Sequence, residues 1–201
     1  MGGRVRAYIG LGANVGDAQA TLTDAIAALA ALPGARLRGV SRLYRTTPVG
    51  VTDQPDFRNA VVAIEVAAGD DPASGATQLL VGLKALERSF GRRRRRRWGP
   101  RELDLDLLVF GRARLAIERP PEGAPLSAAL DQGAAARLLE VPHPSIADRL
   151  FVLAPLADLA PRLVPPGWHE TVRAAAERRR AIEGPNAAVP VAKWAGDRWL
   201  P

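Results

Sequence analysis

The stretch LDLDLLVF at residues 103–110 alternates leucine with aspartate and then becomes continuously apolar. Because successive side chains of a strand point to opposite faces of a sheet, this pattern predicts a β-strand whose leucines lie on the buried face. The same alternation places Asp104 and Asp106 together on the other face. The stretch therefore predicts one strand of a sheet and a pair of neighbouring carboxylates.

The segments before this strand complete a recognisable order. A strand over 4–11 precedes a helix over 18–31, which Pro33 and Gly34 end. Strands over 35–46 and 57–66 follow, and leucines at helical spacing predict a helix over 75–90. The order strand, helix, strand, strand, helix, strand predicts an α+β protein with the ferredoxin-like βαββαβ arrangement, an antiparallel sheet with two helices on one face.

The length of 201 residues predicts one domain with appendages. Residues 1–161 are expected to form this domain, with a surface excursion at about 112–137 that is rich in Ala, Pro and Gly. Residues 162–201 are expected to be an extension that packs on the domain or trails from it, with one helix within 169–183. The chain has neither an apolar run of roughly 18 residues nor a secretion signal, so the cytoplasm is the expected compartment.

Charge and composition narrow the class of function. The absence of cysteine excludes disulfides, thiolate metal sites and a thiol nucleophile, and two histidines are too few for a His-rich cluster. Six consecutive arginines, Arg92–Arg97, supply most of the net charge of +7. One basic segment indicates a local polyanion such as nucleotide phosphates, whereas a globally basic chain would indicate nucleic acid. The excess of arginine over lysine fits heat adaptation and a GC-rich genome equally.

The two aspartates and the nearby arginines form the most specific chemical pattern. Like charges on one strand face repel unless a cation lies between them, and Mg²⁺ that bridges carboxylates to phosphate oxygens supplies such a cation. Arg101 and the arginine run add guanidinium groups that bind phosphate oxygens in pairs. A solvated strand face and a solvated linker are the alternative interpretations.

Three other segments carry weaker patterns. In TTPVGVTDQPDFRN (46–59), Asn59 suits the amide edge of a heterocycle and Phe57 suits its face; a plain loop is the alternative. His143, between two prolines, is either a turn residue or a neutral hydrogen-bond donor to phosphate. GLGANVGD (10–17) matches neither the dinucleotide fingerprint nor a Walker A loop, so it predicts a strand-to-helix turn.

Three blocks of the sequence resemble a known family. They are YRTTPVGVTDQPDFRNAV (44–61), ERSFGRRRRRRWGPRELDLDLLVFG (87–111) and VPHPSIADRLFVLAPL (141–156). They look like the signatures of the 6-hydroxymethyl-7,8-dihydropterin pyrophosphokinases, and with YIGLGANVGD (8–17) the likeness runs from about residue 5 to residue 161. This family transfers the diphosphate of ATP to a pterin alcohol in folate biosynthesis, on a ferredoxin-like fold.

The resemblance implies a role for each matching position. Asp104 and Asp106 would hold two Mg²⁺ ions on ATP, and Arg92 and Arg101 would act with them in catalysis. The implied ATP-binding residues are Glu87, Arg94, Arg97, Trp98, His143 and Arg149. The implied pterin-binding residues are Thr46, Pro48, Val49, Phe57, Asn59 and Phe151. The chain departs from the family where Thr47 replaces a common proline, Pro144 a frequent aromatic, and Phe57 a frequent tyrosine.

The expected reaction is an in-line attack of the pterin hydroxymethyl oxygen on the β-phosphorus of ATP, with AMP as the leaving group. The expected partners are ATP and the pterin, without nucleic acid or membrane, and the chain is expected to be a monomer. One rival is an RNA-binding module, which shares the βαββαβ order but binds bases through aromatics on its central strands. Here the first strand offers only Tyr8. The other rival is a nucleotide sensor without catalysis.

Overall fold

The computed structural model describes residues 3–48, 50, 53–91, 99–120 and 137–201. Its centre is a seven-stranded antiparallel sheet in the order β5-β1-β4-β3-β8-β9, with β2 also paired to β4. The strands are β1 (Arg4–Ala13), β2 (Arg36–Val40), β3 (Leu43–Thr46), β4 (Phe57–Ala67), β5 (Asp104–Phe110), β8 (Val189–Trp194) and β9 (Trp199–Leu200).

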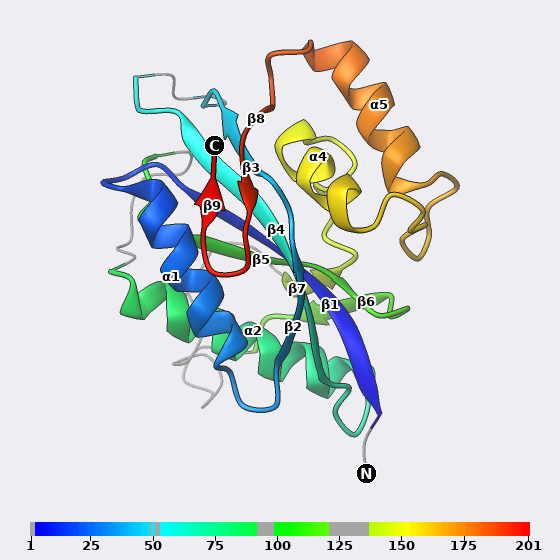
Figure 1. Cartoon of the computed structure of the whole chain (residues 1–201). Coiled ribbons are helices and arrows are strands. Elements are labelled where there is room, and N and C mark those ends of the chain that lie inside the picture. Colours follow the sequence, from blue (N-terminus) through cyan, green and yellow to red (C-terminus); the bar gives the residue numbers. More distant parts are fainter. Residues whose placement is uncertain (1–2, 49, 51–52, 92–98, 121–136) are drawn as a thin grey trace.

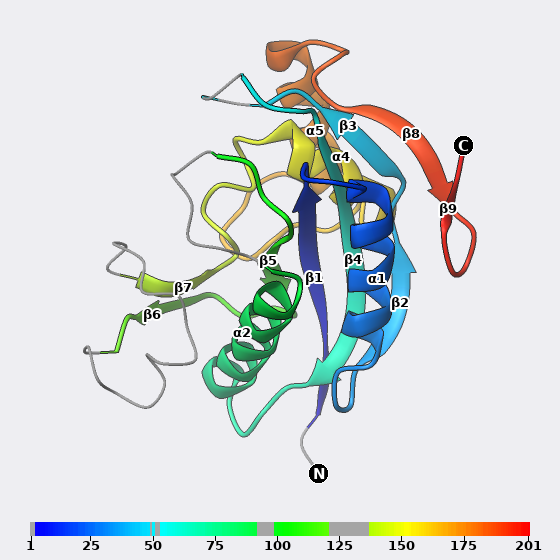
Figure 2. The same ribbon diagram turned by 90° about the vertical axis from the view of Figure 1, so that its left-hand side faces the viewer.

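Helices cover both faces of this sheet. Figures 1 and 2 show α1 (Ala18–Ala30) and α2 (Pro72–Ser89) on one face, and α4 (Leu150–Leu159) and α5 (Val172–Glu183) on the other. The element order and the placement of the first two helices confirm the predicted ferredoxin-like arrangement. The strand and helix pattern did not reveal that α4 and α5 would close the second face.

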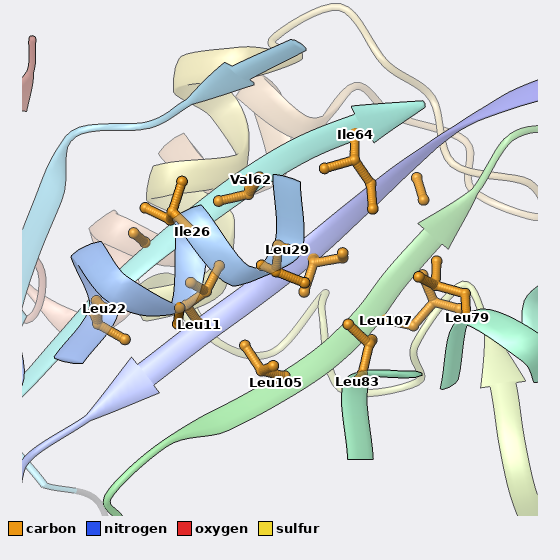
Figure 3. Packing of buried hydrophobic residues seen from close by; sticks show 14 of the residues in the cluster. Leu11, Leu22, Ile26, Leu29, Val62, Ile64, Leu79, Leu83, Leu105 and Leu107 are labelled. Carbon is orange, nitrogen blue, oxygen red and sulfur yellow. The ribbon is translucent and has the colours of Figure 1, made fainter. Parts of the chain in front are cut away.

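Alternation along the strands divides the core between the two faces. On the face of α1 and α2, Leu22, Ile26 and Leu29 pack with the strand residues that Figure 3 labels, which are Leu11, Val62, Ile64, Leu105 and Leu107. On the other face, Val61, Leu108 and Val109 pack with residues of α4 and α5. Burying each such side chain contributes about 1.5–3 kcal/mol, so the sheet is stabilised from both sides.

The helix α2 begins at Pro72, three residues before the predicted start. The Asp71 carboxylate accepts hydrogen bonds from the N–H groups of Ala73 (2.7 Å) and Ser74 (3.0 Å), and Ser74 Oγ accepts one from the Asp71 N–H (3.3 Å). This is a capping box, and Pro72 at the first helical position has no N–H that needs a partner. The hydrophobic period alone missed this polar first turn.

The segment predicted as one strand over 35–46 is divided into β2 and β3 at Ser41. The Ser41 hydroxyl accepts a hydrogen bond from the Val61 N–H (2.9 Å). In a regular ladder, a backbone carbonyl would be the acceptor. The carbonyl of Ser41 instead accepts a hydrogen bond from Trp199 Nε1 (3.1 Å). A serine side chain therefore lets the strand bend while its backbone groups keep partners.

The predicted excursion after β5 begins and ends in regular structure. Strands β6 (Leu115–Glu118) and β7 (Arg137–Val141) form a separate antiparallel pair that projects from the body of the protein in Figure 2. The abundance of Ala, Pro and Gly concealed these short strands. Residues 121–136 lie outside the described part of the chain.

The C-terminal residues form the predicted helix and also two strands that the sequence analysis did not predict. The helix α5 begins after Thr171, whose hydroxyl accepts the Ala174 N–H (3.2 Å). Strand β8 pairs with β3, and Trp199 of β9 is buried in an edge-to-face contact with Trp194, with ring centroids 4.9 Å apart. Over the described residues, every helix is too short or too polar to span a bilayer.

We predict that an ion pair on the sheet makes stability depend on pH in acid. The Glu65 carboxylate of β4 accepts hydrogen bonds from Arg38 of β2 (2.5 Å) and Arg6 of β1 (2.9 Å), and these two guanidinium groups lower its pKa from 4.5 to about 2. A depressed carboxylate pKa contributes stability that is complete above the unfolded-state pKa and is lost as pH falls through the folded-state value.

Denaturant unfolding of the native protein and of Glu65→Gln between pH 6 and pH 2 checks this prediction. The native protein should be the more stable above about pH 4.5, and the difference should shrink as the pH approaches about 2. A difference that is constant over this range would contradict the assignment.

Candidate active site

The two predicted aspartates lie on β5 as the alternation requires. Asp104 and Asp106 are half-buried, whereas Leu105 between them is fully buried on the face of α1 and α2. Asp104 forms an ion pair with Arg101, which lies three residues upstream. The predicted carboxylate pair and the neighbouring arginine are therefore together at the start of β5.

Strand register connects this carboxylate to the predicted pterin residues. Asp104 of β5 lies opposite Gly12 of β1, Gly12 lies opposite Asn59 of β4, and Asn59 lies opposite Tyr44 of β3. Residues directly opposite each other in antiparallel strands share a face. Since neighbouring strands are about 4.8 Å apart, the backbones at Asp104 and Asn59 are about 10 Å apart, with only a glycine between them.

The glycine at position 12 keeps the space between these two side chains open. A Cβ at Gly12 would lie 3.0 Å from Asn59 Oδ1, which is tighter than ordinary contact. Asn59 and Thr46 are both buried, and Asn59 Nδ2 donates a hydrogen bond to Thr46 Oγ1 (2.7 Å). The amide is thus fixed in place, and Gly12 adds no side chain to the surface between it and Asp104.

The predicted aromatic residues approach from two directions. Phe57 is half-buried at the start of β4, two residues before Asn59, and therefore on the same face. Phe151 is half-buried in the first turn of α4, the helix that covers this face. The guanidinium of Arg149 lies 5.7 Å from the centroid of the Phe151 ring. Pro48, between β3 and β4, is half-buried.

His143 has the tautomer that a phosphate donor needs. The imidazole Nδ1 accepts a hydrogen bond from the Ser145 N–H (3.2 Å), and the backbone N–H of His143 donates to the Leu108 carbonyl (2.9 Å). A neutral imidazole that accepts at Nδ1 carries its proton on Nε2. This ring is therefore a hydrogen-bond donor, as one of the two sequence interpretations requires.

Glu87 and Lys84 of α2 hold the peptide between the two aspartates. The Glu87 carboxylate, which is 1% exposed, accepts the Leu105 N–H (2.7 Å) and pairs with Lys84 Nζ (3.0 Å). Lys84 Nζ also donates to the Leu105 carbonyl (3.3 Å). β5 is the edge strand of the described sheet, so no further strand pairs with its outer side there. The side chains of Glu87 and Lys84 bond the Leu105 N–H and carbonyl instead.

Tyr44 fixes α4 over the sheet. Its hydroxyl donates to the Asp158 carboxylate of α4 (3.0 Å) and accepts a hydrogen bond from Arg42 (2.8 Å), which also pairs with Asp158. Burial, together with the charge of Asp158, raises the pKa of Tyr44 above its ordinary value. The phenol therefore stays protonated and keeps its bond to the helix.

Asn14 joins the two halves of the site. Its Nδ2 donates to Gln54 Oε1 and to the Pro55 carbonyl, both at 3.0 Å, and its Oδ1 accepts the Arg101 N–H (2.8 Å). The Asn14 N–H donates to the Arg101 carbonyl (3.0 Å). One buried amide thus ties the segment before Phe57 to the arginine beside Asp104. The sequence offered only a turn here.

A cavity of about 430 Å³ lies beside Asn14 but on the other side of the sheet. It is lined by the first turn of α1 together with Pro55, Asp56 and Arg58. Arg58 and Asn59 are adjacent on β4, so their side chains point to opposite faces. This cavity is therefore separate from the space between Asn59 and the aspartates.

Several predicted residues lie outside the described part of the chain. They are Val49, Arg92, Arg94, Arg97 and Trp98. Among the described residues, Arg101 pairs with Asp104, and strand register aligns Asp104 with Asn59. Phe57 lies on the same face, and Phe151 lies in the helix that covers this face. Asn14, Lys84, Tyr44 and Gly12 belong to the same assembly, and the sequence analysis missed them. Gly12 and Asn14 lie at and just after the end of β1, Tyr44 lies within β3 and Lys84 lies within α2, and no local pattern marked any of them as part of the site.

An antiparallel α+β sheet that presents two carboxylates, an arginine and a fixed amide on one face has the arrangement of a phosphoryl-transfer enzyme. Residues 8–161 match the family model of 7,8-dihydro-6-hydroxymethylpterin-pyrophosphokinase (HPPK). The chain belongs to this family.

Curated relatives agree with the family match. The chain is 42% identical over 170 residues to the 2-amino-4-hydroxy-6-hydroxymethyldihydropteridine pyrophosphokinase of Methylorubrum extorquens, covering 85% of this chain and 90% of the relative. It is 40% identical over 165 residues to the enzyme of the same name from Pseudomonas aeruginosa, covering 82% and 86%.

Solved structures agree with the fold. Plasmodium falciparum HPPK-DHPS wild type aligns with the whole of this chain at a TM-score of 0.71 and 15% identity, and this chain spans about half, 50%, of that one.

The chain is thus a diphosphokinase of folate biosynthesis, which transfers the diphosphate of ATP to hydroxymethyldihydropterin. The family match favours the diphosphokinase over the RNA-binding module and the nucleotide sensor as the interpretation of the βαββαβ order.

We predict that Asn14→Ala disturbs both sides of the site. Loss of the amide leaves the part-buried backbone N–H of Arg101 without its acceptor, which costs about 1 kcal/mol of stability. It should also lower kcat roughly 10-fold, because Arg101 is displaced. Asn14→Asp keeps an acceptor for Arg101 and should retain more of kcat. Steady-state kinetics and thermal unfolding of both variants measure this, and an Asn14→Ala enzyme with native kcat would contradict it.

Proposed function

We propose that catalysis takes place on the face of the sheet that carries Asp104, Asp106 and Asn59, with the triphosphate at the aspartates and the pterin at the amide. The observation that carries this proposal is the row Asp104–Gly12–Asn59 across three strands in register. A heterocycle paired with Asn59 and lying over Gly12 would direct its substituent toward the carboxylates. This orientation is what transfer to a hydroxymethyl group requires.

The chemistry of the two carboxylates fits Mg²⁺. In the described residues there is no group of three or more His, Cys, Asp or Glu side chains that would form a closed metal cage. Two carboxylates leave most coordination positions to phosphate oxygens and water, which is the way Mg²⁺ is usually held on a nucleotide. Two Mg²⁺ ions bound by Asp104 and Asp106 would neutralise phosphate charge as the reaction proceeds.

The pterin side of the proposal uses a fixed amide and two aromatic rings. Thr46 holds the Asn59 amide, so the amide edge meets the heterocycle in one orientation. Phe57 and Phe151 approach from β4 and α4 and would stack on the two faces of the ring. Pro48 limits the backbone freedom of the adjoining segment, and Val49 is assigned to the same pocket by resemblance alone.

The nucleotide side of the proposal uses the guanidinium and imidazole groups near α4 and β5. Arg101 would bind the transferred diphosphate next to Asp104. His143 would donate from Nε2, and Arg149 would bind the nucleotide from the start of α4. Glu87 supports this side through its bond to Leu105. The assignments of Arg92, Arg94, Arg97 and Trp98 rest on the family resemblance.

In the proposed reaction, the pterin hydroxymethyl oxygen attacks the β-phosphorus of ATP, the bond to the α-phosphate oxygen breaks, and AMP leaves. The hydroxyl gives its proton to solvent water as the new O–P bond forms, and the bridging oxygen leaves on the α-phosphate of AMP. Such transfers depend mainly on positioning and charge neutralisation, which the row of residues and Arg101 would supply. The monomeric state and the cytoplasmic location stay predictions from the sequence, as does the division of the chain at residue 161.

We predict that Asp104→Asn and Asp106→Asn each lower kcat at least ~100-fold, because a carboxylate on a phosphoryl-transfer metal contributes several kcal/mol in the transition state. Both side chains are half-buried and change little in size, so the melting temperature should stay close to that of the native protein. Turnover at saturating ATP, pterin and Mg²⁺ measures the effect. Native-like turnover of either variant would overturn its assignment.

We also predict that Gly12→Ala weakens pterin binding. The added methyl group would lie 3.0 Å from Asn59 Oδ1 and occupy the surface on which the ring is placed. The pterin KM should rise at least ~10-fold, while the affinity for ATP should change little.

Gly10→Ala is the matched control, because this methyl group lies on the same strand and face and its three nearest atoms all belong to the Leu108 side chain, at 3.4 Å or more. Equal pterin KM values for the two alanine variants would argue against the pocket at Gly12.

A further inference from the structure

The helix α4 lacks a cap of its own. Arg149 at its N-cap position makes no side-chain hydrogen bond to the first turn. The Leu150 N–H donates instead to Glu183 Oε1 (3.1 Å), a carboxylate on the last residue of α5. A carboxylate at a helix N-terminus also interacts favourably with the helix dipole. The C-terminal extension therefore supplies the cap for this helix.

The capped turn is the one that carries the proposed ligand residues. Leu150 is fully buried, with Arg149 before it and Phe151 after it. A buried N–H that loses its acceptor destabilises the turn, and the turn can regain a partner only by moving toward water. The placement of both neighbouring side chains therefore depends on Glu183.

Further contacts keep Glu183 at this position. Arg179, one turn earlier on α5, pairs with its carboxylate at 2.5 Å. Val172, Ala175 and Ala176 of α5 pack in the same cluster as Leu153 and Leu156 of α4. After Glu183 the chain continues into β8, which pairs with β3 next to Tyr44. The extension thus contacts both α4 and the strand that leads to Thr46.

We propose that Glu183 is a positioning residue for pterin binding, acting through the first turn of α4 on Phe151. It lies beyond residues 8–161, the part of the chain that the family model covers. The proposal rests on the proposed placement of Phe151 against the pterin. It gives the C-terminal extension a part in the substrate site, in addition to its packing on the domain.

The test compares Glu183→Ala with Glu183→Gln and with Glu177→Ala. Glutamine keeps an oxygen that can accept the Leu150 N–H, and Glu177 is an exposed carboxylate on the same helix. Glu183→Ala should raise the pterin KM about 5- to 10-fold with kcat nearly unchanged, the size expected for one lost cap. Glu183→Gln should stay within about twofold of the native pterin KM, because its amide oxygen can still accept the Leu150 N–H. Glu177→Ala should also stay within about twofold, because Glu177 does not cap α4.

A double-mutant cycle with Phe151→Ala separates positioning from simple destabilisation. If Glu183 acts through Phe151, Glu183→Ala should raise the pterin KM little further once Phe151 is alanine. Independent, additive effects would overturn the proposal, as would a lowered melting temperature of Glu183→Ala with native KM values.

The cycle also distinguishes failure of the proposal from failure of the proposed site. A Phe151→Ala variant with raised pterin KM beside a Glu183→Ala variant with native KM would remove only the role of Glu183. A native pterin KM in Phe151→Ala would instead overturn the placement of Phe151 in the pterin site, and the role of Glu183 with it.

Discussion

The pairing of β1 with both β4 and β5 is the constraint on which the site depends. Gly12 must lie opposite Asp104 on one side and opposite Asn59 on the other. A slip of one residue in either ladder would turn the carboxylate or the amide to the face of α1 and α2. The buried side chains of Leu11 and Leu105 prevent such a slip, because it would move them out of the core on the face of α1 and α2. The hydrophobic core therefore sets the alignment of the polar residues.

Polar side chains then hold the margins of the sheet in place. Asn14 joins Arg101 to the segment before β4, Glu87 and Lys84 hold the edge strand β5, and Tyr44 holds α4. Each of these groups is wholly or largely buried and satisfies backbone or charged partners. Removing one leaves its partner buried without a hydrogen bond, which costs more than the bond contributed. These hydrogen bonds and ion pairs thus link the elements that carry the site residues to one another.

Much of the site was predictable because its signals are local. Asp104 and Asp106 share a strand face by their spacing alone, and Arg101 is three residues away. The resemblance to the HPPK family added the residues that are proposed to bind the pterin and the nucleotide. The role of Asn14 was not predicted, because its hydrogen-bond partners lie about forty and eighty-seven residues away in sequence. The role of Ser41 was not predicted either, because its hydroxyl replaces a carbonyl in a ladder to Val61.

By itself, the sequence determined the order of the strands and helices of the βαββαβ unit, the carboxylate pair on one face of β5, and the membership of the family. The tertiary structure alone decided that Asp104, Gly12 and Asn59 form one row, that α4 and α5 cover the second face, and that Glu183 caps α4. The physical reason is the range of the interactions. Alternation and helical period express burial within a few residues, whereas register and helix docking depend on contacts between segments that are distant in the chain.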